Sequence, residues 1–136
     1  MLKPGVPIRR TGAPLSVWLG PGLVGNIYDG IQRPLPGIQA HSGAWIRRGE
    51  KVDPLDTSKR WTFEPLVRRG ESVVAGQGIG QVTETPLVKH RVMIPPDVSG
   101  IVRSIVEPGE HALRDSLAVV ETAAGPRQIT MLQQWP

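Results

Sequence analysis

The chain has 136 residues, no cysteine, and a net charge of +4 from 16 Lys and Arg against 12 Asp and Glu. This length suits one domain, or one domain with a flanking arm, and the lack of cysteine excludes disulfides and thiolate metal ligands. Apolar runs are short, so we expect neither a membrane span nor a signal peptide. The basic residues come as isolated pairs with few aromatic residues between them, which does not favour nucleic-acid binding.

Glycine and proline occur throughout the chain, with 16 Gly and 14 Pro between short runs of Val, Ile and Leu. This spacing is typical of short strands joined by tight turns, and it predicts an all-β fold. Residues 1–14 contain Pro4, Pro7 and Pro14, so we expect an extended N-terminal arm there. A short strand should follow over residues 15–19.

Three glycines after this strand, Gly20, Gly22 and Gly25, have the G-x-G-x-x-G spacing of a dinucleotide-binding loop. That fingerprint requires a helix next and an acidic residue about 20 positions further on. Prolines follow within a few residues instead, and Trp45 occupies the position of the acidic residue. A phosphate loop would also need Lys and Ser or Thr directly after the last glycine, where the chain has Asn26. We therefore interpret these glycines as a turn and expect no bound cofactor.

Asp29 and Gly30 form a second turn signal, and together with the three glycines they mark a structural junction. Residues 36–56 lack sustained periodicity, and we predict a long excursion there with one strand near Trp45. Residues 61–64 alternate apolar and polar, which predicts a half-buried strand with Trp61 and Phe63 facing the core.

The second half of the chain contains a near-repeat. The turn at Gly70 and Glu71 and the two strands after it recur at Gly109 and Glu110, with an offset of 39 residues that falls to 38. Residues 90–102 between the copies predict strand, turn and strand. Two interlocking half-barrels would close the sheet and remove its edges. Matching glutamates, including Glu84 with Glu121, are then explained by duplication rather than by acid/base catalysis.

This quasi-repeat is similar to the barrel-sandwich fold of biotinyl and lipoyl carrier domains. Those carriers present a lysine on a hairpin, and Lys89 lies 11 residues before Gly100, about where a biotinyl lysine falls. Its neighbours Val88 and His90 are neither the methionines of a biotin acceptor nor the acidic residue of a lipoyl site. A carrier domain with Lys89 as acceptor is therefore the alternative function.

Residues that could carry chemistry are sparse. His41, His90 and His111 are too widely separated for a zinc motif, and the chain has no G-x-S-x-G elbow. We expect no metal site and no catalytic residue.

Five blocks of the chain, residues 11–17, 19–35, 59–65, 90–100 and 131–136, carry a family resemblance. They resemble the catalytic A subunit of rotary V-type and A-type ATPases, and they occur in the order of that family. The Gly-Pro-Gly through Arg-Pro-Leu block of residues 20–35 is the most specific.

The resemblance implies the bulge, or non-homologous, insertion of the catalytic A subunit. Residues 1–36 would be the N-terminal arm and Gly-rich junction loop, and residues 37–136 the bulge β domain. In that family the phosphate loop and catalytic glutamate lie after the segment that ends here at Pro136, which implies no ATPase activity for this region. The domain would face the cytoplasm as a peripheral part of the complex, without entering the membrane.

The partners implied are the other subunits of the ATPase head and the peripheral stalk. The arginine pairs Arg47, Arg48 and Arg68, Arg69 are the candidate contacts with acidic stalk helices. Away from the other parts of the enzyme, we expect residues 1–36 to be open to non-native self-association, and the residue 15–35 stretch to be among the least well anchored parts of the chain.

Overall fold

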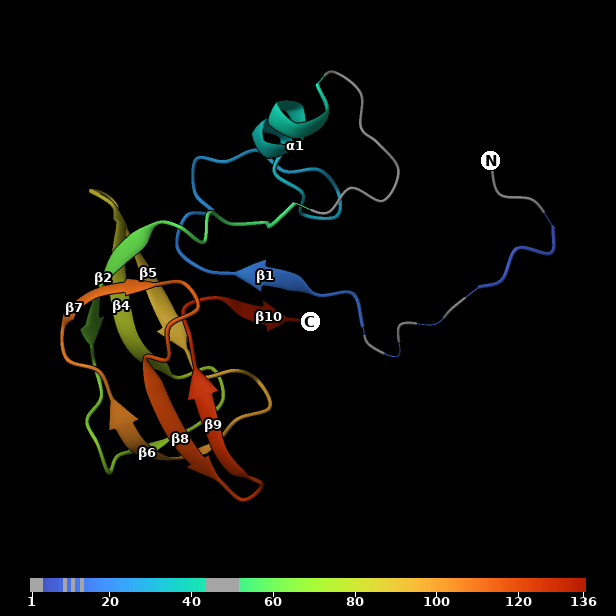
Figure 1. Ribbon diagram of the computed structural model, residues 1–136. Helices are drawn as coiled ribbons and strands as arrows, with labels where there is room; N and C mark the ends of the chain where they lie inside the picture. The colour runs from blue at the N-terminus through green and yellow to red at the C-terminus, as the bar shows by residue number, and fades with distance from the viewer. Residues whose placement is uncertain (1–3, 9, 11, 13, 44–51) are drawn as a thin grey trace.

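The computed structural model describes residues 4–8, 10, 12, 14–43 and 52–136. Strands dominate, with one short helix near the N-terminal side (Figure 1). In chain order the elements are β1 (Val17–Leu19), α1 (Leu35–Ser42), β2 (Arg60–Pro65), β3 (Ser72–Val73), β4 (Gly78–Thr85), β5 (Val88–Met93), β6 (Gly100–Ile105), β7 (Gly109–Ala112), β8 (Ala118–Thr122), β9 (Gly125–Ile129) and β10 (Gln133–Trp135).

Two four-stranded antiparallel sheets form the body, with strand orders β5-β4-β2-β7 and β3-β6-β8-β9 (Figure 1). The half-repeats explain these orders, because β2–β5 correspond in sequence order to β6–β9. Each half builds three strands of its own sheet and lends its second strand, β3 or β7, to the other sheet. The backbone hydrogen bond from Leu66 to Ile79 recurs as that from Val106 to Leu117, both at 2.8 Å. The predicted interlocking of two half-repeats is confirmed.

The all-β fold with barrel-sandwich architecture is confirmed, but the predicted closure is not. Each sheet is open in its hydrogen bonding, with β5 and β7 at the edges of one sheet and β3 and β9 at the edges of the other. Side chains between the sheets hold them together instead. The exchanged strands are short, since β3 has two residues and β7 has four. They therefore do not join the two sheets into one continuous hydrogen-bonded ladder.

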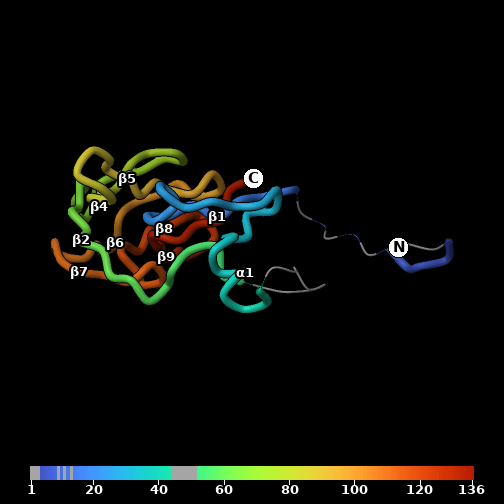
Figure 2. The backbone as a smooth tube through the Cα atoms, turned by 90° about the horizontal axis from the view of Figure 1, so that it is seen from above, coloured from blue at the N-terminus to red at the C-terminus, as the bar shows by residue number. Residues whose placement is uncertain are grey.

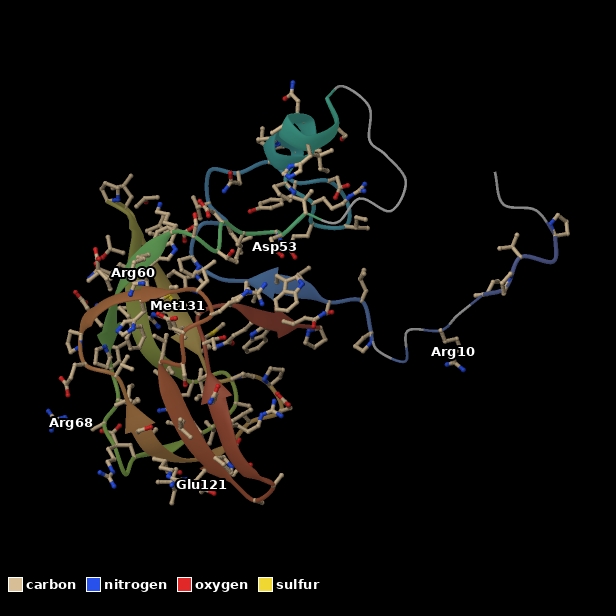
Figure 3. The ribbon with its side chains drawn as sticks, in the orientation of Figure 1. Arg10, Asp53, Arg60, Arg68, Glu121 and Met131 are labelled. Carbon is tan, nitrogen blue, oxygen red and sulfur yellow. The ribbon has the colours of Figure 1, made fainter. Side chains whose placement is uncertain are left out.

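The core lies between the two sheets. In β2, Trp61 and Phe63 are buried while their neighbours are exposed, as the alternation of residues 61–64 predicts. Met131, just before β10, lies in the interior of the body (Figure 3). The fully buried large side chains come from both half-repeats and from the segment after β9: Phe63, Ile79, Ile94, Leu113, Leu117, Ile129 and Met131.

Helix α1 differs from the sequence prediction, which places a single strand within residues 36–56. Pro34 precedes the helix and Pro36 lies in its first turn, where a backbone N–H has no partner within the helix to lose. Gly43 ends it with φ of +70° and donates its N–H to Gln39 O at 2.9 Å. The predicted strand near Trp45 lies outside the described residues.

The described part of the N-terminal arm, residues 4–8, 10, 12 and 14, is exposed and runs away from the body (Figure 2). After the arm, β1 pairs antiparallel with β10, with Val17 opposite Trp135 and Leu19 opposite Gln133. The first described strand therefore lies beside the last one, and both lie between α1 and the body (Figure 1).

Candidate functional site

The Gly-rich stretch after β1 folds back onto the body. A Cβ atom on Gly20 would lie 2.9 Å from Leu55 Cδ1 and 3.3 Å from Met131 O, so only glycine fits without displacing a neighbour. Gly22 has φ of +104° and Gly25 has φ of +88°, which favour glycine. The expectation that these glycines shape a turn agrees with this geometry, and no helix follows them before Leu35.

Two backbone amides of the loop donate hydrogen bonds to a carboxylate of this chain. Glu84 Oε1 accepts hydrogen bonds from Gly22 N at 2.7 Å and from Val24 N at 3.0 Å. Asn26 Nδ2 donates to Gly22 O at 2.6 Å and braces the turn from inside. The sequence pattern presents Glu84 only as half of a duplicated pair, and no local motif marks it.

The second junction turn is organised by Asp29. Asp29 Oδ1 accepts from Ile31 N at 3.1 Å and Arg33 N at 2.9 Å, and Oδ2 pairs with the Arg33 guanidinium through Nε and Nη2, both at 2.7 Å. At Gly30, between the acceptor and its first donor, an added Cβ would meet nothing within 4 Å. Gln32 has φ of +60° and bonds Trp18 through both side-chain amide atoms, so the turn is also tied to β1.

The bonds to Asp29 predict a pH dependence of the turn. The backbone hydrogen bond from Arg33, with smaller contributions from its guanidinium and from Ile31 N, lowers the pKa of Asp29 below its usual value. A carboxyl whose pKa is depressed in the folded state stabilises that state above the unfolded pKa and loses this contribution as the pH falls through the folded pKa. We expect the Arg33 amide proton shift to titrate below the ordinary aspartate pKa. A midpoint at or above that value, or no titration in this range, would contradict the arrangement.

Residues 16–35 have more attachments than the prediction of a poorly anchored junction expects. This stretch is attached to the body by the ladder to β10 and by the bonds to Glu84. It is also attached to itself, because Leu35 N donates to Ile27 O at 2.9 Å. No sequence pattern indicates these contacts, since Gly22 and Glu84 are 62 residues apart.

Two cavities adjoin the junction. One of about 470 Å³ lies beneath α1 and is lined by residues that include Tyr28, His41 and Asp53, and Figure 3 shows Asp53 on this side. A second of about 390 Å³ lies between the Gly22 loop and Trp61. Within the described part of the chain, the Tyr28 hydroxyl and the Trp61 indole nitrogen are buried without a hydrogen-bond partner, and burial raises the pKa of Tyr28.

Arg68 and Arg69 lie in the loop between β2 and β3. Both are exposed, and Arg68 points outward at the end of the body opposite α1 (Figure 3). A cavity of about 440 Å³ beside them is lined by equivalent segments of the two half-repeats, residues 65–69 and 104–107. Neither arginine forms an ion pair with another described residue. Arg47 and Arg48 lie outside the described residues.

Lys89 is exposed on β5 opposite Thr83, past the turn that joins β4 to β5. The next residue, His90, lies opposite Val82 and lines an apolar cavity of about 180 Å³ between β5 and the β1–β10 pair. Burial lowers the pKa of His90, and the charge of Glu84 acts in the opposite direction. The structure thus places Lys89 on a strand rather than at a hairpin tip.

Glu84 and Glu121 do not occupy equivalent environments, in contrast to the sequence expectation. Glu121 lies opposite Ile101 and forms an exposed ion pair with Arg103 at 3.6 Å, whereas Glu84 holds the junction loop. The mismatch arises because Val82 matches Val120, so that Glu84 corresponds to Thr122. Over the described residues, no three His, Asp or Glu side chains gather in a geometry that could hold a metal ion.

Comparison with known proteins identifies the domain. A family model described as the ATPsynthase alpha/beta subunit barrel-sandwich domain matches residues 52–136. The chain belongs to this barrel-sandwich family. The matched region contains every strand of both four-stranded sheets, β2 through β9, so the family unit coincides with the interlocked half-repeats.

Three relatives match almost the whole barrel-sandwich chain, and each of them is an A subunit of an A-type ATP synthase. The chain is 50% identical over 135 residues to the one from Staphylothermus marinus, 47% identical over 136 residues to that of Methanopyrus kandleri, and 45% identical to that of Saccharolobus islandicus. Each match covers 99% of this chain but only 22 or 23% of the relative. The chain therefore spans less than a quarter of the length of these relatives. None of its described helices is long and apolar enough to cross a membrane.

Proposed function

We propose that this barrel-sandwich chain is a structural and interaction region of the catalytic A subunit of a V/A-type ATP synthase and does not itself catalyse ATP chemistry. The observation that carries the proposal is the near-complete match of the chain to A subunits of A-type ATP synthases, combined with the folded sandwich at residues 52–136. The proposed setting is the cytoplasmic, membrane-peripheral part of the complex.

The junction geometry supports the lack of nucleotide chemistry. The loop amides that a phosphate would meet are bonded to Glu84, at 2.7 Å for Gly22 and 3.0 Å for Val24. Asn26 follows Gly25 where a phosphate loop has lysine, so the loop supplies no ammonium group for a β- or γ-phosphate. Backbone amides already paired with a carboxylate within the chain are poor receptors for a second anion.

Exposed apolar side chains support a division of roles along the chain, with residues 1–36 as arm and junction and residues 37–136 as the β domain. Leu15 is 87% exposed, Ile27 66% and Ile31 68%, although the turns that carry them are tied down. Packing against another protein surface would remove the apolar area of these side chains from water. We propose that this face packs against other parts of the ATP synthase.

Arg68 and Arg69, at the end of the body opposite α1, support contact with an acidic partner. We propose that this partner is the peripheral stalk. Arg68 and Arg69 are exposed beside a cavity of about 440 Å³, with exposed Leu66 nearby. Glu107 also lines this cavity, so the two arginines make one side of it basic, and basic charges steer an acidic partner and fix its register. The proposed contact includes Arg47 and Arg48.

Charge reversal at this end tests the stalk contact. Arg68→Glu combined with Arg69→Glu should weaken binding of the chain to a purified peripheral-stalk heterodimer about tenfold or more, because two attractive rim charges become repulsive. Isothermal titration calorimetry at low and at higher salt measures the change, and the salt dependence should shrink in the variant.

The matched control is Lys89→Glu combined with Arg91→Glu, which makes the same charge change on exposed residues of β5. The control should bind like the original chain. Equal weakening by both variants would point to net charge alone, and unchanged affinity of the Arg68 and Arg69 variant would remove this end from the interface.

The carrier alternative gains no support from the position of Lys89. Lys89 lies on β5 past the turn, paired with Thr83, and the turn residues Thr85 to Val88 carry no lysine. A carrier lysine must reach the sites of other proteins, which favours a position at a loop tip. We therefore propose the structural role alone.

A further inference from the structure

We infer that Glu84 is a positioning residue that clasps the junction loop, residues 20–25, to the hairpin of β4 and β5, so that the junction and the sandwich move as one body. The clasp consists of the two bonds that Glu84 Oε1 accepts, from Gly22 N at 2.7 Å and Val24 N at 3.0 Å. This inference concerns the chain by itself and does not depend on the proposed stalk contact.

The loop is shaped to receive one anion. Amides of residues two apart in sequence converge on a single oxygen, the arrangement of a backbone nest. Gly22 reaches this shape with φ of +104°, and a Cβ there would lie 3.3 Å from the Trp61 ring, so the loop also packs on the core. Hydrogen bonds to a carboxylate are about twice as strong as those between neutral groups. The Gly22 bond is partly buried and the Val24 bond is exposed, so the clasp attaches the loop mainly through Gly22.

The strand β4 is irregular at the residue that makes the clasp. Thr83 lies opposite Lys89 and Thr85 lies opposite Val88, so Glu84 is the extra residue of a β-bulge. Bulges re-aim a side chain and terminate regular pairing. Here the bulge coincides with the residue whose carboxylate leaves the ladder and meets the junction loop.

The second half-repeat has no such clasp. Its equivalent residue, Thr122, accepts from Ala124 N at 3.2 Å and donates to Gly125 O at 2.8 Å, which closes its own hairpin. In the first half, Thr85 performs the closure by accepting from Leu87 N and Val88 N, which leaves Glu84 free for another role. A difference between otherwise matching halves indicates that Glu84 serves the junction, whose loop also packs against Trp61 of the first half.

The clasp gives the junction a second attachment. The ladder between β1 and β10 holds residues 17–19, and Glu84 holds the loop that follows. Two separated attachments fix an orientation, whereas one ladder of three residues allows rotation about itself. Removal of the carboxylate should leave both sheets intact and free the loop.

Nuclear magnetic resonance of the ¹⁵N-labelled chain tests the clasp with Glu84→Ala, Glu84→Gln and the control Glu64→Gln. Glu64 is an exposed carboxylate on neighbouring β2 whose side chain bonds Gln81. Amide exchange at Gly22 and Val24 measures the bonds, and residual dipolar couplings of the loop against those of β2 and β4 measure its orientation.

In the original chain, loop and strand couplings should fit one alignment tensor. In Glu84→Ala we expect exchange at both amides about tenfold faster or more and loop couplings that no longer fit the strand tensor, with strand amides unchanged. Glu84→Gln keeps one acceptor oxygen, so its amide exchange rates and loop couplings should lie between those of the original chain and those of Glu84→Ala. Unchanged exchange and couplings in Glu84→Ala, or equal effects in Glu64→Gln, would overturn the inference.

Discussion

Gly80→Ala should destabilise the domain by about 3 kcal/mol or more, although it adds a single methyl group. A Cβ at this position would overlap Phe63 Cε2 and Cζ and would lie 2.9 Å from Glu64 O. Phe63 is fully buried, so its ring has no solvent to move into, and the carbonyl belongs to the paired strand β2. Either β4 and β2 separate or the ring leaves its rotamer. Urea unfolding followed by circular dichroism measures the loss.

Gly78→Ala on the same strand is the matched control, because nothing lies within 4 Å of the Cβ it would add. It should change stability by less than about 1 kcal/mol. A further variant, Gly80→Ala with Phe63→Leu, should lose less than the sum of the two single changes, since the smaller side chain makes room for the methyl group. Equal losses for Gly78→Ala and Gly80→Ala would refute the close approach.

Phe63→Ala should cost about 3–5 kcal/mol, as is usual for a fully buried aromatic ring. The ring fills the space between the sheets and meets His111 edge to face, with centroids 6.3 Å apart. His111 comes from β7, the strand that the second half-repeat lends to this sheet, so the ring joins the two halves. Its loss leaves a cavity where the halves interlock.

The same unfolding experiment measures this effect, with exposed Thr62→Ala on β2 as the control, for which we expect less than about 1 kcal/mol. An effect of Phe63→Ala below about 1.5 kcal/mol would show that the sheets collapse around the gap, contrary to a tightly interlocked core.

The sequence predicted those features that rest on local patterns. Alternation at Trp61 and Phe63 identified β2 and its buried face, and the repeated Gly-Glu turns identified the two halves. Duplication is visible in sequence because both copies keep the same turn residues at a nearly constant offset. The exchange of β3 and β7 between sheets follows from that symmetry.

Features that rest on contacts between distant segments were not predictable. Helix α1 carries Pro36 and Gly37, which argue against a helix unless its first turn is known to begin at Leu35. Glu84 lies in a strand of ordinary composition, and its role depends on a loop about 60 residues away. The anchoring of the junction was missed for the same reason.

The candidate site also combines features that follow from local sequence patterns with features that depend on contacts between distant segments. The glycine spacing at Gly20, Gly22 and Gly25 predicted a turn, and the missing helix and acidic residue argued against a nucleotide. Which group would occupy the turn required the fold, because the bulge at Glu84 brings the carboxylate to the amides. The arginine pairs were visible in sequence, but only Arg68 and Arg69 lie within the described residues.

The central claim, a structural region of the catalytic A subunit without nucleotide chemistry, is tested most directly by calorimetry of the chain against two ligands under the same buffer. We expect saturable heat on titration with the purified peripheral-stalk heterodimer, reduced by Arg68→Glu with Arg69→Glu, and no heat on titration with ATP and magnesium. Saturable heat with ATP and magnesium, together with none from the stalk at high micromolar concentration, would contradict the account.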